Sequence, residues 1–283
     1  MLKAFVARWT LSIFLVISFT PIISYADKVL IYPKPRHERD MRDDYPIELL
    51  KLALERSEQK IEIVTANTPM QQQRALWAVE NGLVDIMWTM MNQTRESYPY
   101  SVPFDIYQGI FGNRLILIHQ DQLAEFSKIE HPCDFYKYTA IMGHDWPDTR
   151  FYLHHGLPIT TSSSYESLFN MLLKGHGDYF PRSVSEIFIE LEHHTNEPFV
   201  VEPNWMIVYK AEMRFILSKQ AYESYGQAIL KGLNQTLADG SFNKLFEKFH
   251  GDVLKKAQLN KRKWLNLDMN YQMHCDLLEK ARR

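Results

Sequence analysis

Two arginines of this sequence stand where a negatively charged group of a small molecule could be held. Arg95 and Arg182 each come shortly after a short apolar run, residues 85–90 and 178–180, that a Gly-x-x-Asp turn introduces. Glycine tolerates the left-handed conformation that ends a helix and aspartate favours a tight turn, so each segment is predicted to run helix, turn, strand. Because loops at the carboxyl ends of parallel strands form ligand sites, the repeat predicts two similar α/β lobes with an arginine on each wall of a cleft.

The chemistry expected of these arginines is a carboxylate clamp. A guanidinium group presents a planar fork of N–H donors that binds a carboxylate through two parallel hydrogen bonds. Each arginine also has a structural alternative: Arg95 could pair with Glu96 at the surface, and Arg182 could pair with Glu186, one helical turn further on. At Arg182 both roles are compatible, since a carboxylate behind a ligand-binding arginine orients it.

Aromatic residues are candidates for the walls of the cleft. Tyr32 ends the first predicted strand and faces either the cleft or the interior, whereas Trp88, within the third, is a wall candidate that could equally serve packing. Tyr179 and Phe180 follow each other on a strand, so only one of them can face the cleft. We predict that Tyr179 does, because its hydroxyl group offers a hydrogen bond. Trp146 could stack on a ligand or belong to the core.

Trp146 also precedes Pro147 at a predicted helix start. The free backbone N–H groups of a helix start attract anions, helped by the helix dipole. Asp145 could occupy these donors itself, and we predict that its side chain caps the helix.

The segments before residue 114 alternate between strand and helix patterns. Short apolar or alternating runs indicate strands, and the helices between them begin with proline. This order predicts a β-α-β-α-β series and hence a parallel, doubly wound sheet. A second α/β series follows, and extended segments before and after it could carry the chain between lobes. The expected organisation is lobe one over 27–113, lobe two over 114–207, a return to lobe one over 208–253 and a solvated C-terminal tail over 254–283. Two crossings of this kind form a hinge that allows closure around a ligand.

The N-terminus has the pattern of an export signal. A charged start, an apolar stretch from Trp9 to Ile23 and small residues before Asp27 predict a secretory signal peptide over residues 1–26. An uncleaved anchor is the alternative, although the apolar stretch is shorter than a membrane span needs and contains Pro21. We therefore expect a periplasmic protein. Its formal charge of −2 is mixed along the chain, so neither nucleic acid nor lipid is indicated as a partner.

The sequence has two cysteines, Cys133 and Cys275. In an oxidising compartment they could form a disulfide or remain as two free thiols, and sequence alone leaves both possibilities open. Neither has a second cysteine or a histidine at ligand spacing, so no metal site and no cofactor are expected. The sequence also lacks the motifs of serine hydrolases, phosphate-binding loops and zinc proteases. We therefore expect that this protein is not an enzyme.

Several motifs together resemble the family 3 extracellular solute-binding proteins, which have the type II periplasmic binding fold and include the amino-acid-binding components of ABC transporters. The resemblance covers roughly residues 28–249, and its motifs lie at residues 77–86, 94–96, 101–104, 167–169 and 175–178. It implies an α/β protein of two doubly wound lobes joined by a two-crossing hinge. It also implies that Arg95 grips the α-carboxylate of a ligand, although one residue fewer than usual separates this arginine from the following aromatic residue.

The resemblance further implies a monomer that captures a small anionic or zwitterionic solute, such as an amino acid, for an ABC permease. A sensory module that reports to a membrane partner without transport is the main alternative, and a dehydratase or lytic enzyme with Glu186 or Asp148 as acid or base is a weaker one. Lobe two departs from the amino-acid binders, because residues 143–149 replace their usual Gly-Thr-rich turn. The ligand's identity therefore does not carry over.

Overall fold

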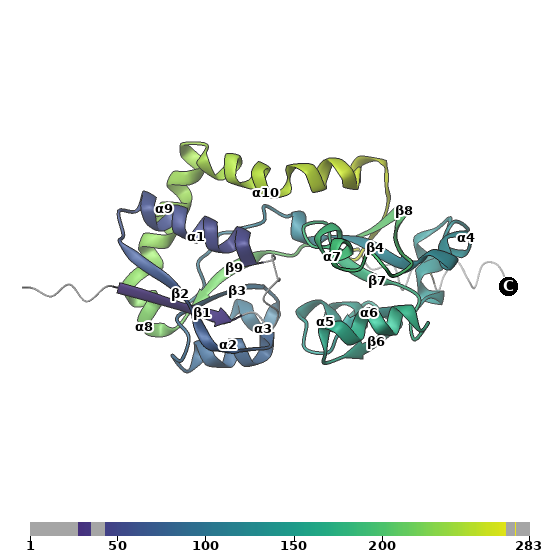
Figure 1. Ribbon diagram of the computed structural model, residues 1–283, viewed down its shortest axis with the longest axis horizontal. Coiled ribbons are helices and arrows are strands. Elements are labelled where there is room, and N and C mark those ends of the chain that lie inside the picture. Colours follow the sequence, from purple (N-terminus) through teal and green to yellow (C-terminus); the bar gives the residue numbers. More distant parts are fainter. Residues whose placement is uncertain (1–27, 35–42, 270–274, 276–283) are drawn as a thin grey trace, which may run out of the picture.

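The computed structural model describes residues 28–34, 43–269 and 275, and the predicted signal peptide lies outside them. Figure 1 shows two lobes side by side, with one long helix, α10, lying across both. None of the described helices combines the length and the apolar character that a membrane crossing requires.

Lobe one contains two pairs of strands covered by helices. Strand β1 lies parallel to β2, and β3 pairs antiparallel with β9, the strand on which the chain returns from lobe two. A backbone hydrogen bond of 2.8 Å from Asp85 to Ile31 joins β3 to β1. The elements of lobe one are β1 (Lys28–Lys34), α1 (Asp44–Arg56), β2 (Ile61–Pro69), α2 (Gln72–Glu80), β3 (Ile86–Met90), α3 (Gln93–Glu96), β9 (Met213–Leu217), α8 (Lys219–Ala221) and α9 (Gln227–Ala238).

Helices α1 and α9 pack closely enough to require a glycine. The apolar side of α1, with Leu49, Leu50 and Ala53, is fully buried, as its helical spacing predicts. A Cβ atom at Gly232 of α9 would lie 1.8 Å from the carbonyl oxygen of Ala53. The two helix backbones are therefore in direct contact, which fixes the helical layer behind the sheet of lobe one.

Lobe two is built around a mixed sheet in the order β10-β8-β4-β7 and a parallel pair, β5 and β6. Strand β4 is buried from Leu115 to Ile118 and pairs antiparallel with both β7 and β8. The elements are β4 (Asn113–His119), α4 (Leu123–Phe126), β5 (Ala140–Gly143), α5 (Pro147–His154), β6 (Ile159–Ser162), α6 (Tyr165–Leu173), β7 (Phe180–Ser183), α7 (Ile187–His193), β8 (Phe199–Val208) and β10 (Lys263–Asn266).

Helix α10 (Ser241–Ala257) connects the two lobes (Figure 1). Phe242, near its start, is fully buried in the core that includes α1, whereas Ala257, at its end, is fully buried with Phe188 of α7. The chain then forms β10, which pairs in parallel with β8. The prediction of a solvated tail from residue 254 is wrong for this stretch, because Leu265 is fully buried in lobe two. A crossing along α10 thus adds to the two that the sequence predicts.

The two cysteines form a disulfide bond. Cys133 and Cys275 have Cα atoms 5.5 Å apart and are joined through their sulfur atoms. Of the two possibilities that the sequence left open, the structure has the disulfide, and it ties residue 275 to lobe two.

Candidate functional site

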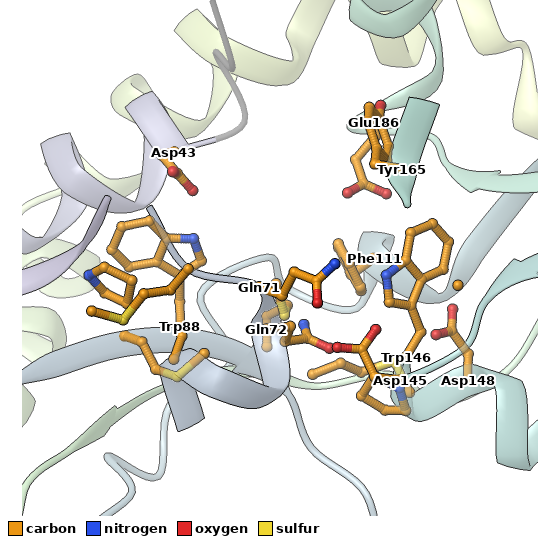
Figure 2. Close-up of a pocket in the computed structure, with 18 of the residues that line it drawn as sticks. Asp43, Gln71, Gln72, Trp88, Phe111, Asp145, Trp146, Asp148, Tyr165 and Glu186 are labelled. Carbon is orange, nitrogen blue, oxygen red and sulfur yellow. The ribbon is translucent and has the colours of Figure 1, made fainter. Parts of the chain in front are cut away.

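A pocket of about 260 Å³ lies between the lobes and is lined by residues of both. Figure 2 shows Trp88 on one side and Trp146 on the other, with Gln71 and Gln72 from the start of α2 between them. The lining also includes Asp43 from lobe one, and Asp145, Asp148, Tyr165 and Glu186 from lobe two. The pocket lies where the sequence predicts a cleft.

Trp88 stands on β3 and is partly exposed to the pocket. Its ring lies 5.8 Å from that of Tyr32 and meets Phe215 edge-on at 6.4 Å. Tyr32 itself is not among the lining residues; it packs against Trp88 instead. Of these two aromatic residues, Trp88 therefore belongs to the lobe-one wall, and Tyr32 supports it from behind.

Trp146 forms the corresponding wall in lobe two. Its ring covers the backbone at the end of β5, where a Cβ atom at Gly143 would lie 2.3 Å from an indole carbon. The ring also stacks on Phe180 at 6.0 Å, and the guanidinium carbon of Arg182 lies 4.7 Å from its centroid. Three neighbours thus hold Trp146 in place at the pocket.

Arg182 lines the pocket but is already neutralised by carboxylates of α7 and the turn before it. Its Nη2 atom lies 2.6 Å from Glu190 Oε1 and 3.0 Å from Glu186 Oε2, and its Nε atom donates to Glu190 Oε2 at 2.8 Å. Burial alone would lower the pKa of Arg182, but Glu186 and Glu190 raise it above its ordinary value. Arg182 therefore lines the pocket and forms the ion pair with Glu186 that the sequence offered as its alternative.

A second buried arginine, Arg114 on β4, also lines the pocket, and our reading of the sequence missed it. Its Nη2 atom lies 2.8 Å from Asp148 Oδ2, its Nη1 atom 3.5 Å from Glu186 Oε2, and its Nε atom donates to the hydroxyl of Tyr209 at 2.7 Å. Burial lowers its pKa, and the contacts with Tyr209, Asp148 and Glu186 more than offset this. The available signal was a single charge inside the apolar run 113–119.

Arg95 is not among the residues that line the pocket. It is only 6 % exposed, and its Nη1 atom donates to the hydroxyl of Thr89 and, at 3.0 Å, to the carbonyl of Met90. Its Nη2 atom lies 3.5 Å from Oε1 of Gln72, which does line the pocket. Burial lowers the pKa of Arg95 to about 10. Arg95 thus stands behind the wall, in contact with a side chain that forms it.

Tyr179 lies elsewhere, and the prediction that it faces the cleft is wrong. Its side chain is fully buried within lobe two, with ring contacts to Phe126 at 6.1 Å and Phe135 at 5.9 Å. The neighbouring residue Phe180 points the other way and stacks under Trp146. The two residues face opposite sides of the strand, as expected. Phe180, and not Tyr179, is the one that faces Trp146.

Asp145 does not cap α5, contrary to our prediction, because no side-chain capping bond is present at that helix start. It reaches towards lobe one and accepts a hydrogen bond of 3.3 Å from the backbone N–H of Gln73. Beside it, the side-chain amide of Gln71 donates to the carbonyl of Ser163 at 2.6 Å. The two lobes are therefore hydrogen-bonded to each other beside the pocket.

No site for a metal ion is evident in the part of the chain that the structure describes. Within residues 28–34, 43–269 and 275, no group of at least three His, Cys, Asp or Glu side chains is arranged to hold one. Asp148 and Glu186 of the pocket are instead paired with arginines, and Asp145 is hydrogen-bonded to the opposite lobe.

Neither the family models nor the curated proteins contain a match to this sequence. Solved structures do resemble the fold. The arginine-, lysine-, histidine-binding protein ArtJ from Geobacillus stearothermophilus superposes with a TM-score of 0.56 at 14% identity, covering 80% of this chain and 96% of ArtJ. The ligand-binding core of GluR0 from Nostoc punctiforme, in complex with L-glutamate, has a TM-score of 0.56 at 11% identity, covering 78% of this chain and 98% of that core.

A third similar structure is a histidine kinase sensor domain with similarity to periplasmic binding proteins, with a TM-score of 0.55 at 14% identity, covering 80% of this chain and 96% of that domain. At these identities the likeness concerns the fold. It confirms the α/β, type II periplasmic binding architecture that the sequence predicts.

Proposed function

We propose that this protein is a solute-binding protein that captures one small molecule in the pocket between its lobes. The observation that supports this most strongly is the pocket itself, which both lobes line and which has a tryptophan on each side. Its volume of about 260 Å³ suits a solute of amino-acid size. Proteins of the same fold that bind arginine, lysine, histidine or glutamate are consistent with this size.

Capture would work through differential affinity for the closed arrangement of the lobes. A ligand that touches both Trp88 and Trp146 binds the closed form better than an open one, and it therefore shifts the population towards closure. The hydrogen bonds of Gln71 and Gln73 to lobe two would reinforce the closed form. In this proposal Arg182 holds Trp146 in place, Arg95 holds Gln72, and Tyr32 supports Trp88.

A thermal-shift screen tests this proposal. The purified protein is heated with amino acids, amines, small carboxylates and short peptides, and a true ligand at about 100 times its dissociation constant should add about 2.7 kcal/mol to the free energy of unfolding. Trp88→Ala and Trp146→Ala should each abolish the shift. Trp77→Ala is the matched control, because Trp77 is 53% exposed and lies outside the pocket. A shift that survives both pocket variants would refute the site.

We propose delivery to an ABC permease from the periplasm, by a monomer, as the biological role. The sensory alternative has an observation of its own, the likeness to a histidine kinase sensor domain. Neighbouring genes separate the two: a permease and an ATPase beside this gene favour transport, whereas a membrane kinase or cyclase favours sensing.

A further inference from the structure

The arginines beside the pocket are committed to carboxylates of the protein itself. Arg182 contacts Glu186 and Glu190, and Arg114 contacts Asp148 and Glu186, at nitrogen–oxygen distances between 2.6 and 3.5 Å. Both guanidinium groups are almost completely buried, with 2 to 3 % of each side chain exposed. A ligand carboxylate that sought either arginine would have to compete with an ion pair that is already formed and dehydrated.

The charges that line the pocket are acidic on balance. Among the described residues of the lining, Lys34, Arg114 and Arg182 are cationic, whereas Asp43, Asp145, Asp148 and Glu186 are acidic. Behind the lining, Glu190 adds a carboxylate next to Arg182, and Arg95 adds a cation next to Gln72, so these two additions cancel. Because opposite charges at close range cancel, the arginine-rich corner offers little positive potential to a ligand.

Asp145 is the carboxylate best placed to act on a ligand. It is partly exposed, in contrast to Asp148, which is 5 % exposed and bound to Arg114. Its hydrogen bond from the backbone N–H of Gln73 is 3.3 Å long and spans the two lobes. Figure 2 shows it beside Gln72, between the two tryptophans. A cation held there would contact lobe two and stabilise the region where the lobes meet.

The aromatic walls of the pocket also favour a cation as the ligand. The face of an indole ring attracts cations, and tryptophan does so more strongly than tyrosine or phenylalanine. Trp146 already has one such partner in Arg182, and Trp88 presents its partly exposed ring from the opposite lobe. Aromatic rings with nearby carboxylates suit an ammonium or guanidinium group.

The geometry points to an organic cation as the ligand of this pocket, with Asp145 as its counter-charge. This cation is an amine or a guanidine that needs no carboxylate of its own in order to bind. This inference rests on the proposed solute-binding function and names the class of solute. It replaces the anion bridging two arginines that the sequence predicts.

Matched ligand pairs test the inference. Calorimetric titrations of the disulfide-bonded protein would compare agmatine with L-arginine and cadaverine with L-lysine, which differ only by the α-carboxylate, and would include L-glutamate and glutarate as anions. We expect each decarboxylated amine to bind at least 10-fold more tightly than its amino acid. Tighter binding of an amino acid or of glutarate would overturn the inference and leave the solute-binding function standing. Binding of none of these, together with a thermal-shift screen without hits, would overturn both.

A variant tests the role of Asp145. Asp145→Asn should weaken binding of the better amine by about 10-fold, since it removes the charge and keeps the shape of the side chain. Asp252→Asn is the control, because Asp252 is fully exposed on α10 and outside the pocket. Circular dichroism checks that both variants are folded. Unchanged amine affinity in Asp145→Asn would overturn its assignment as the counter-charge.

Discussion

At the scale of single residues, the main feature of this protein is a group of buried charged side chains beside the pocket. Arg114, Arg182 and Glu190 are each at most 4 % exposed, and such groups are tolerated only when paired and hydrogen-bonded. These ion pairs also explain why the residue type alone did not predict whether an arginine binds a ligand. An arginine after a strand predicts an anion site equally well whether or not the protein supplies the anion.

The sequence led to part of the candidate site. Trp88 within a predicted strand, Trp146 at a predicted helix start and Arg182 after a predicted strand do line the pocket. Arg114 was missed because its partners Asp148 and Tyr209 lie 34 and 95 residues away in the chain, and only the fold brings them together. Tyr179 was misplaced because strand alternation says that neighbouring residues face opposite sides and does not say which side is which.

His250 is a buried titratable residue outside the pocket, and it gives a prediction of pH dependence. It is 4 % exposed, its ring lies 4.5 Å from that of Tyr45, and its Nε2 atom has no hydrogen-bond partner among the described residues. Burial lowers its pKa from 6.5 to about 4. In the unfolded chain it gains a proton below pH 6.5, whereas in the folded protein it stays neutral down to about pH 4.

The free energy of unfolding should therefore fall as the pH drops from 6.5 to 4, by roughly 3 kcal/mol from this residue alone. Urea unfolding at several pH values measures the slope. His250→Phe, which keeps an aromatic ring among aromatic neighbours, should remove this contribution, whereas the exposed control His193→Asn should retain it. Equal slopes in both variants would contradict the assignment.

At the scale of elements, the helices and strands were largely predictable and their partners were not. The periodicity of α1 and the Gly-x-x-Asp turns before β3 and β7 were readable because they are local. The pairing of β3 with β9, and of β10 with β8, joins segments that are more than 50 residues apart. The charges between residues 255 and 263 favour a solvated tail over 254–283, yet β10 just beyond them is exposed only at its start and buries Leu265 completely.

The Cys133–Cys275 disulfide should stabilise the folded protein, including the C-terminal segment that follows β10. It spans 142 residues of sequence, and cross-links that close long loops lower the entropy of the unfolded chain most. Replacing both cysteines by serine should lower the free energy of unfolding by about 3 to 5 kcal/mol, as measured by denaturant unfolding of both proteins under oxidising conditions. An unchanged midpoint would show that β10 and residue 275 are held in place without the bond.

At the scale of the whole molecule, the two-lobed fold was predictable because both lobes carry the same local signals. The crossing along α10 was not, since a helix that packs on two lobes has the same apolar periodicity as one that packs on a single lobe. Phe242 near the start of this helix is buried in the same cluster as the residues of α1, and Ala257 at its end is buried with Phe188 of α7. Any closing motion must therefore move it or bend the chain at its ends.

The central claim is that one small solute binds between Trp88 and Trp146. Isothermal titration calorimetry with the best ligand of the thermal-shift screen tests it most directly. The account predicts one bound molecule per chain in the wild-type protein and no measurable heat of binding in the Trp88→Ala, Trp146→Ala double variant. Undiminished binding in that variant, or a stoichiometry well above one, would contradict it.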